Sequence, residues 1–564
     1  MRALRSQPGA ALGRDGPARP QPAWGWLLPS LGLACLAVAL LWEFSVFPVD
    51  GPHDSLRYLG MAESLLQGDW LGPYDHMALI RTPVYSALLA LNALFGWRLH
   101  VFQQVAYLTS VLLLCCSLTS YGLSGWRIVL IFGLCAFHPL LLYVAGFVTT
   151  EALYVPAALA VASGCLGLMR AHDRSARVWV FWITVLTISM PIFWHIRPDG
   201  AWILPFLFVC GVLLLQGMST DRKHAWKRAA LAMVLPGVAC VLLGHALAQQ
   251  NEQRYGLRVA HELAETEFEG ALRGLTRLAP EDRKPFVPVS KAGLAVAYEF
   301  SPQFRRLEPY LSAHVNGQGW SAHGCALMGV CDELAGGWAL WAIRDAAARA
   351  GVYESANGAS QFYRAVAAEI RVTCEQGLAA CSRNPTGNML APPVTLGDLP
   401  RIAHSLLNMM ALTISFGDFA AERKVWELAH RDVALAQRYD QITGDQQLKP
   451  SALVYGRSFD AVIFAYRVLP LVFAVMGALA LAVLAWRGRL RVVGVYSSLL
   501  SSPMFWLVCC LAVDLLGRWM ILAYIDAMSF SAHIRYLLVV YPMLMVLLVL
   551  MLPPWRFSVK QRAT

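Results

Sequence analysis

The stretch WLLPSLGLACLAVALLWEFSVF, residues 26–47, carries one charged side chain, Glu43. A helix needs about 20 mostly apolar residues to cross a bilayer, so this stretch is long enough to span one. It is too long for the apolar region of a cleavable signal peptide, and no small-residue cleavage site follows it. We therefore expect a membrane span that stays in the protein.

Nine further apolar stretches of similar length follow, at 101–121, 128–147, 152–169, 178–196, 201–217, 229–247, 461–486, 502–524 and 534–553. They predict an all-α polytopic membrane protein with about ten transmembrane helices. The composition agrees, because 57% of the residues are hydrophobic and 15% are charged, against about 45–50% and about 25% in soluble proteins. A disordered chain, a disulfide miniprotein and an ordinary soluble enzyme are thereby excluded.

The formal net charge of +10 is explained by where the basic residues lie. With the N-terminus in the cytoplasm, the short inside segments hold eighteen Lys and Arg residues, and the short outside loops hold five. Short cytoplasmic loops are rich in Lys and Arg. We therefore expect both termini in the cytoplasm, and we read the basic excess as a topology signal with no nucleic-acid partner.

The spans divide the chain into four parts. We predict a cytoplasmic basic tail at 1–25, a transmembrane core at 26–248 that includes a long first outer loop at 48–100, an extracytoplasmic domain at 249–459, and C-terminal transmembrane helices with a cytoplasmic tail at 460–564. The extracytoplasmic domain should be mainly helical, because residues 337–351 and 360–378 repeat apolar side chains at helical spacing.

Cysteine usage supports this division. Nine of the 13 cysteines lie in predicted spans, and the other four, Cys325, Cys331, Cys374 and Cys381, lie in the predicted extracytoplasmic domain. Disulfides persist in oxidising compartments. Of the three possible pairings we favour Cys325–Cys331 with Cys374–Cys381, since each pair is close in sequence. These spacings differ from those of zinc sites, so no metal is expected.

The first outer loop holds the most informative polar residues. Asp50 and Asp54 follow the first span directly. Residues 55–67 predict an amphipathic helix on the membrane surface. Residues 83–96, from Pro83 to Gly96, form a second apolar stretch that is too short to span comfortably, so we expect a juxtamembrane helix.

These loops resemble those of the GT-C glycosyltransferases, especially the branch of the aminoarabinose transferases and protein O-mannosyltransferases. The resemblance lies in HDSLRYLGMAESLLQGDW (53–70), RTPVYSALLALNALFG (81–96), FVTTEALYV (147–155), HIRPDG (195–200) and SAHIRYLLVVYP (531–542). It covers 26–217 and 530–545, and says almost nothing about 249–459. Ser55 stands where the family often has a second acid. Each motif is weak alone, but all lie on one side of the predicted topology.

The resemblance implies an enzyme that moves a sugar from a polyprenyl-phosphate donor to an acceptor hydroxyl, with inversion and without an indicated metal or other cofactor. Asp54 would be the general base, with Asp50 as the alternative. The implied phosphate ligands are Arg81, Arg197, Arg535 and His533, and the implied substrate contacts are Glu151, Arg57 and Tyr58. Arginine suits a phosphate because its planar fork stays charged and binds two oxygens.

The expected partners are a polyprenyl-phosphate-linked sugar, a glycan, lipid or protein acceptor, and the bilayer. The expected location is a bacterial inner membrane, with the active site on the extracytoplasmic face. A transporter or lipid flippase, a membrane-anchored assembly protein, and an enzyme using pyrophosphate-linked oligosaccharides are the alternatives.

Structural roles are open for several of these residues. Asp54 suits the N-cap of the helix that starts at Ser55, and Asp199 suits a cap as well. Arg81 and Arg535 suit anchors at the lipid interface. Asp514 and Arg518, four residues apart inside a span, are expected to pair with each other.

Overall fold

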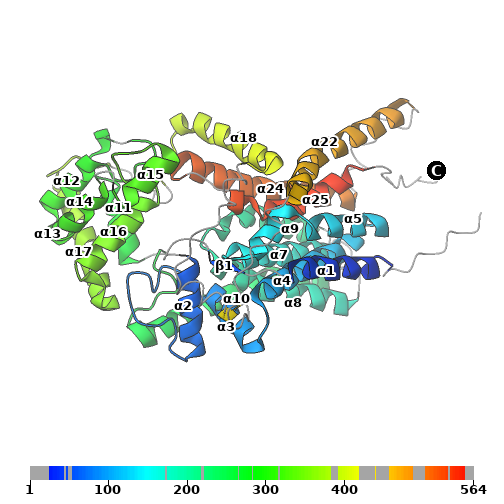
Figure 1. Cartoon of the computed structure of the whole chain (residues 1–564), viewed down its shortest axis with the longest axis horizontal. Coiled ribbons are helices and arrows are strands. Elements are labelled where there is room, and N and C mark those ends of the chain that lie inside the picture. The colour runs from blue at the N-terminus through cyan, green and yellow to red at the C-terminus, as the bar shows by residue number, and fades with distance from the viewer. Residues whose placement is uncertain are drawn as a thin grey trace, which may run out of the picture.

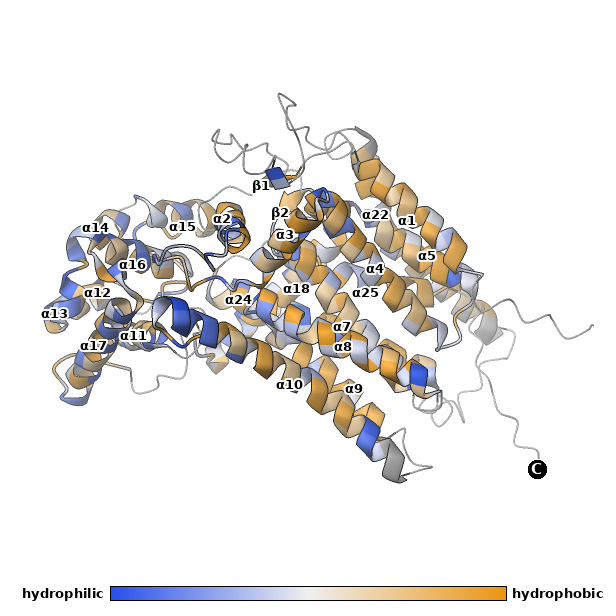
Figure 2. Cartoon of the chain, turned by 90° about the horizontal axis from the view of Figure 1, so that it is seen from below, coloured by the Kyte–Doolittle hydropathy of each residue, from blue (hydrophilic) through white to orange (hydrophobic). Residues whose placement is uncertain are grey.

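The computed structural model describes residues 25–42, 46–48, 54–171, 175–216, 222–263, 266–282, 284–315, 318–382, 392–417, 438–439, 457–486, 502–530 and 534–552. Its helices form two groups, a long bundle and a smaller helical unit at one end of it (Figure 1). The bundle helices are strongly apolar, whereas those of the smaller unit mix polar and apolar residues (Figure 2).

The bundle is formed by helices from both halves of the chain. Its members are α1 (Leu27–Leu41), α4 (Leu99–Thr119), α5 (Gly125–Ala136), α6 (Pro139–Ala145), α7 (Glu151–Ala171), α8 (Ala176–Ile196), α9 (Leu204–Gln216), α10 (Arg222–Tyr255), α22 (Arg457–Trp486), α24 (Pro503–Met528) and α25 (Val540–Leu550). Helix α7 is central and buried over most of its length, and α4 and α8 pack against it.

The described residues contain six helices that are long and apolar enough to cross a membrane, or up to seven if the bent pair of α5 and α6 counts as one span. The protein is therefore an all-α integral membrane protein. The predicted count of about ten is not confirmed: within the described residues, α1, the η1–α9 segment and α25 are apolar helices of fewer than 18 residues.

The smaller unit has its own hydrophobic core, which we call the second core. It is built from α11 (Glu267–Leu275), α12 (Lys291–Phe300), α13 (Pro302–Arg305), α14 (Glu308–Val315), α15 (Trp320–Met328), α16 (Trp338–Arg349) and α17 (Ala356–Glu375), with the short helices η2 (Pro280–Asp282) and η3 (Val352–Glu354). Both predicted disulfides, Cys325–Cys331 and Cys374–Cys381, are present.

The loop at 48–100 folds into the two predicted short helices. Helix α2 (Ser55–Leu66) matches the amphipathic stretch, and α3 (Val84–Phe95) matches the stretch from Pro83 to Gly96. Gly96 ends α3 in a left-handed conformation, with φ of 64°, which glycine adopts without steric cost. Two-residue strands β1 (Phe47–Pro48) and β2 (Phe147–Val148) pair in parallel beside these helices.

Hydrogen bonds and a buried ion pair join the loop between α2 and α3 to the second core. The buried guanidinium of Arg344 donates from Nε to the carbonyl oxygen of His76 at 2.8 Å, and from Nη2 to Glu262 at 2.7 Å. The backbone N–H of Glu262 in turn donates to the carbonyl oxygen of Leu79. These contacts link the two parts, and removing one partner of the Arg344–Glu262 ion pair would leave an uncompensated buried charge.

Helix α18 (Leu399–Ser415) follows η4 (Leu396–Asp398) and does not join the second core. Met409 and Phe416 are buried in the core of the bundle instead, and α18 packs against α24. The segment 249–459, predicted from its polarity as one extracytoplasmic domain, thus contains a helix that packs with the membrane bundle.

Candidate active site

Three loops meet where the bundle adjoins the second core. The Ser55 hydroxyl donates to the carbonyl oxygen of Val148 at 2.6 Å, which joins the start of α2 to the segment before α7. The Thr82 hydroxyl donates to the carbonyl oxygen of Ile196 at 3.3 Å, which joins the loop before α3 to the end of α8. These contacts bring the neighbouring residues Asp54, Glu151, Arg81 and Arg197 into one region.

Charged side chains from these loops, together with Arg535 on η5 and Arg518 on α24, form a continuous network. In order, the N–O distances are Arg81–Asp54 2.6 Å, Asp54–Arg535 4.0 Å, Arg535–Glu151 3.8 Å, Glu151–Arg197 2.8 Å, Arg197–Asp199 3.0 Å and Asp199–Arg518 2.9 Å. Four arginines face three carboxylates, so the network carries one net positive charge. The structure thus brings together Asp54, Arg81, Glu151, Arg197 and Arg535, which sequence reasoning selected.

The network is partly exposed at one end and more deeply buried at the other. The side chains of Asp54, Arg81 and Arg535 are 33%, 29% and 31% exposed, whereas that of Arg518 is 2% exposed. The first three form what we call the open end. A substrate approaching from solvent or from the membrane surface meets the open end first. The other four members form what we call the buried end, and they already make ion pairs with one another: Glu151, Arg197, Asp199 and Arg518.

Arg535, on the short helix η5 (Ile534–Leu537), makes no hydrogen bond to either of the acids beside it. Its distances to Asp54 and Glu151, 4.0 and 3.8 Å, are too long for hydrogen bonds. Its Nη2 donates to the Tyr536 hydroxyl at 3.1 Å, and its buried Nε has no hydrogen-bond partner in the part of the chain that the structure describes. Tyr536, followed by the two acids, holds the pKa of Arg535 above its usual value.

Arg81 is held between aromatic rings. Its guanidinium carbon lies 5.9 Å from the ring centroid of Tyr58 and 5.7 Å from that of Trp341 on α16. Burial alone would lower the pKa of Arg81, but Tyr58 and Asp54 outweigh it and raise this pKa. Arg81 therefore keeps its charge and its direction toward Asp54.

The buried end depends on a close approach of two elements. Gly517 on α24 faces the backbone of Trp202 in η1 (Gly200–Ile203), where a side chain would clash with the Trp202 carbonyl oxygen. This approach brings the next residue, Arg518, to Asp199. Burial would raise the pKa of Asp199, but Arg197 and Arg518 outweigh it and lower this pKa.

Three structural interpretations from the sequence are corrected. Asp54 and Asp199 stand at helix N-caps, yet neither side chain makes a cap hydrogen bond; both bind arginines instead. The expected Asp514–Arg518 pair is wrong. Arg518 binds Asp199 and the carbonyl oxygen of Tyr536, and Asp514 is left with one carboxylate oxygen that has no hydrogen-bond partner in the described structure.

Of the remaining predicted site residues, Tyr58 borders the open end through Arg81, Arg57 pairs outside the network, and two lie outside the described residues. Arg57 points to Asp75 at 3.0 Å, and Tyr58 is buried against Tyr85 with ring centroids 5.0 Å apart. Their proposed substrate contacts stay predictions. Asp50 and His533 lie outside the described residues.

Sequence reasoning missed four members of the site: Trp341, Tyr536, Asp199 and Arg518. Trp341 looked like a packing residue of an amphipathic helix, and Tyr536 like part of an apolar segment. Asp199 was taken for a cap. One usable signal was Arg518, because an ionisable residue inside a span is most often functional or paired.

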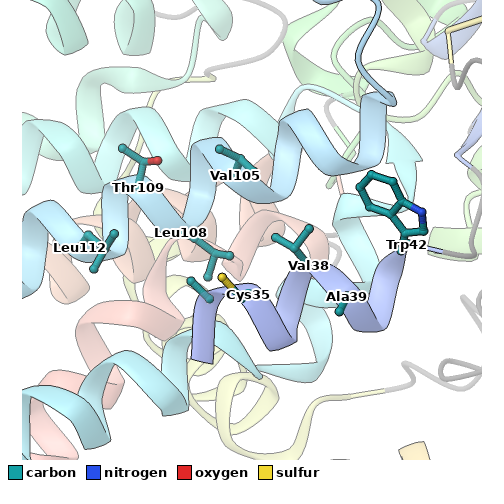
Figure 3. Close-up of a pocket in the computed structure, with 9 residues that line it drawn as sticks. Cys35, Val38, Ala39, Trp42, Val105, Leu108, Thr109 and Leu112 are labelled. Carbon is teal, nitrogen blue, oxygen red and sulfur yellow. The ribbon is translucent and has the colours of Figure 1, made fainter. Parts of the chain in front are cut away.

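An apolar groove of about 620 Å³ lies between α1 and α4 (Figure 3). Its lining residues are Ala34, Cys35, Val38, Ala39, Trp42, Val105, Leu108, Thr109 and Leu112. No charged side chain lines it, so it suits a hydrocarbon chain rather than a polar head group. Among the described residues, no three His, Cys, Asp or Glu side chains are grouped as metal ligands would be.

We expect His261, which is buried beside the loop that carries Arg81, to make stability depend on pH. Burial, followed by the charge of Arg81, lowers its pKa from 6.5 to about 4. Below pH 6.5 the unfolded imidazole takes a proton while the folded one stays neutral, so stability falls from pH 6.5 down to about pH 4. The expected loss is about 1.4 kcal/mol at pH 5.5.

Thermal unfolding of the full-length protein in detergent, followed against pH, measures this loss. His261→Gln removes the titrating group and should flatten the dependence of Tm on pH over this range. An unchanged dependence in His261→Gln would contradict the assignment.

No family model matches the chain, and no curated protein matches it at a significant level. Among solved structures, the chain is similar to ArnT. The crystal structure of ArnT from Cupriavidus metallidurans in the apo state is 15% identical, with a TM-score of 0.32, and the match covers 92% of this chain and 78% of that one. The structure of ArnT from the same organism bound to undecaprenyl phosphate is 16% identical, with a TM-score of 0.30, and the match covers 89% and 78%. Both TM-scores are low, so the function proposed below is drawn from the chain's own residues.

Proposed function

We propose that this protein is a GT-C type glycosyltransferase that transfers a sugar from a polyprenyl-phosphate donor to an acceptor hydroxyl. The observation that carries the proposal is the open end, where Asp54 lies between Arg81 and Arg535 in a network of net positive charge. A carboxylate beside two arginines offers a base for the acceptor and a binding place for the phosphate of the donor.

The two oxygens of Asp54 have different surroundings. Oδ1 accepts from Arg81 at 2.6 Å, whereas Oδ2 lies 4.0 Å from Arg535, which is too far for a hydrogen bond. Oδ2 is thus the oxygen that can accept the proton of an acceptor hydroxyl, at the roughly 2.6–3.2 Å that proton transfer needs. Arg81 fixes the orientation of the carboxylate while this happens.

In the proposed reaction, the acceptor oxygen attacks the anomeric carbon and its proton passes to Asp54. The bond between the anomeric carbon and the phosphate oxygen breaks, and the polyprenyl phosphate leaves with the electron pair. Arg535, whose Nε has no hydrogen-bond partner among the described residues, stabilises the charge that grows on this phosphate. One displacement of this kind inverts the anomeric carbon and forms no sugar–enzyme bond.

Arg197 and Arg518 act as positioning residues in this scheme. Each is within hydrogen-bond distance of Asp199, and Arg197 also binds Glu151, so their charges are largely compensated. Glu151 lies 3.8 Å from Arg535 and keeps that guanidinium beside Asp54. The apolar groove between α1 and α4 is the candidate place for part of the prenyl chain.

The proposal includes the location expected from the basic residues. The site lies on the extracytoplasmic face of a bacterial inner membrane, both termini are cytoplasmic, and the acceptor is a glycan, a lipid or a protein. The enzyme needs no metal.

The deciding experiment is turnover by the purified full-length protein. Polyprenyl-phosphate sugars of several kinds, and polyprenyl-pyrophosphate sugars for comparison, are supplied in detergent, and release of the free lipid phosphate is measured. We expect release from a monophosphate donor, through transfer or through slow hydrolysis. Release from the pyrophosphate donor alone would move the assignment to the oligosaccharide enzymes.

One feature favours the alternative function, a transporter or lipid flippase: the carboxylate of Asp514 is buried inside the span α24. Ionisable residues within spans often mark transport paths. Proteoliposomes that move a labelled glycolipid across the bilayer, with no turnover of any donor, would favour this second function over the first.

A further inference from the structure

Helix α18 runs beside the candidate membrane span α24 in the opposite direction (Figure 1). Near its start, Arg401 donates to the carbonyl oxygen of Ala527 at 3.5 Å, and the Ser405 hydroxyl donates to Asp526. Near its end, the Trp519 indole N–H donates to the Thr413 hydroxyl at 3.0 Å. Helix α18 is therefore antiparallel to α24: it starts beside Met528, the last residue of α24, and its end lies beside Trp519.

The depth of this descent follows from helix geometry. Trp519 precedes Met528 by nine residues, so Thr413 lies about 13 Å below the end of α24 at 1.5 Å per residue. The hydrocarbon layer of a bilayer is about 30 Å thick. Beyond Thr413, the Phe416 ring stacks on Tyr541 at 5.5 Å and on His138 at 5.5 Å, within the core of the bundle. The end of α18 is therefore at the depth of the hydrocarbon layer.

One stripe of α18 is apolar and exposed, and the exposed polar residues His404, Asn408 and Ser415 lie beside it. Leu399, Leu407 and Ile414 are 49%, 65% and 49% exposed, and their spacing puts them on one stripe of the helix. Residues 402–417 contain no Asp, Glu, Lys or Arg. The charged residues Asp398 and Arg401 stand at the shallow end and pair with each other at 2.9 Å.

We propose that α18 is a re-entrant membrane helix whose exposed stripe contacts the acyl chains of the bilayer. A helix satisfies its own backbone hydrogen bonds, so it can lie in lipid, whereas irregular backbone at that depth must be buried in protein. At the end of α18 that the structure describes, Phe416 has φ of 60° and is 2% exposed, and the N–H of Gly417 donates to the Ser415 hydroxyl.

The proposal gives α18 a part in the candidate site. Helix α18 contacts η5, the short helix that carries Arg535. The bilayer would thus help to hold the arginine of the open end in place. The inference itself rests on the candidate spans and not on the proposed reaction, so the two can fail separately.

Photo-crosslinking tests which molecules touch the stripe. The photoreactive residue p-benzoylphenylalanine replaces Leu407 in the full-length protein, which is placed in vesicles of phosphatidylethanolamine and phosphatidylglycerol and irradiated. Mass analysis should find a phospholipid adduct. The matched positive control is Leu471 on the span α22, which is 67% exposed. The matched negative control is Leu327 on α15 of the smaller unit, which is 50% exposed.

The outcome is decided by comparison of these positions. The proposal is overturned if position 471 gives a lipid adduct and position 407 gives none, or if position 407 is cross-linked to another segment of the chain or to a second copy. A second variant carries the photoreactive residue at position 414, so that the stripe can still be tested if the variant at position 407 does not fold. The cross-links of this second variant are judged by the same rule.

Discussion

Replacing Asp54 with asparagine is expected to lower the rate of sugar transfer by about 10²–10⁴-fold, the usual contribution of a general base. The amide keeps the size of the side chain and an oxygen that can accept from Arg81, but it cannot take the proton of the acceptor. Binding of a polyprenyl phosphate should therefore change little. The measurement is kcat with saturating donor and acceptor, together with Kd for the lipid phosphate.

The matched control is Asp69→Asn in the same loop. Asp69 is 43% exposed and pairs with Arg254, outside the network, so this variant should transfer sugar at the wild-type rate. Asp50→Asn decides between the two aspartates. If Asp50→Asn loses activity and Asp54→Asn does not, the base is Asp50. If neither substitution matters, the proposed chemistry of this loop is wrong.

The second large effect is expected for Arg535→Ala. Truncating one partner of a hydrogen-bonded charge pair costs about 2–5 kcal/mol, which weakens binding about 30-fold or more. The apparent Kd for polyprenyl phosphate should rise by that factor, and kcat should fall as well if the contact tightens in the transition state. Arg535→Lys keeps the charge but loses the planar fork, so it should restore only part of the binding.

Arg364→Ala is the control for loss of an arginine. Arg364 lies on α17, is 66% exposed and pairs with Glu267, far along the chain from the network. It should bind the lipid phosphate as the wild type does. Wild-type affinity in a folded Arg535→Ala variant would show that the phosphate is bound elsewhere, and Arg81→Ala would then be the next variant to measure.

Features that depend on neighbours in sequence were predictable. The apolar runs became helices, and α2 and α3 start and end within a residue or two of the predicted bounds. Helical periodicity, Pro83 before α3 and Gly96 after it are local signals, because the backbone hydrogen bonds of a helix join residues four apart. The two disulfides were predictable for the same reason, since each joins cysteines six or seven residues apart.

The sequence by itself determined that the chain is an all-α membrane protein, and it selected acids and arginines that meet at one place. The tertiary structure decided how those charges are shared: Asp199 binds Arg518 across 319 residues of sequence, and Trp341 covers Arg81 from the second core. It also decided that α18, part of a long polar segment, packs against a membrane span. The physical reason is that the partner of a charge or of an apolar face is whichever group the folded chain places within a few ångströms, and no local pattern records that distance.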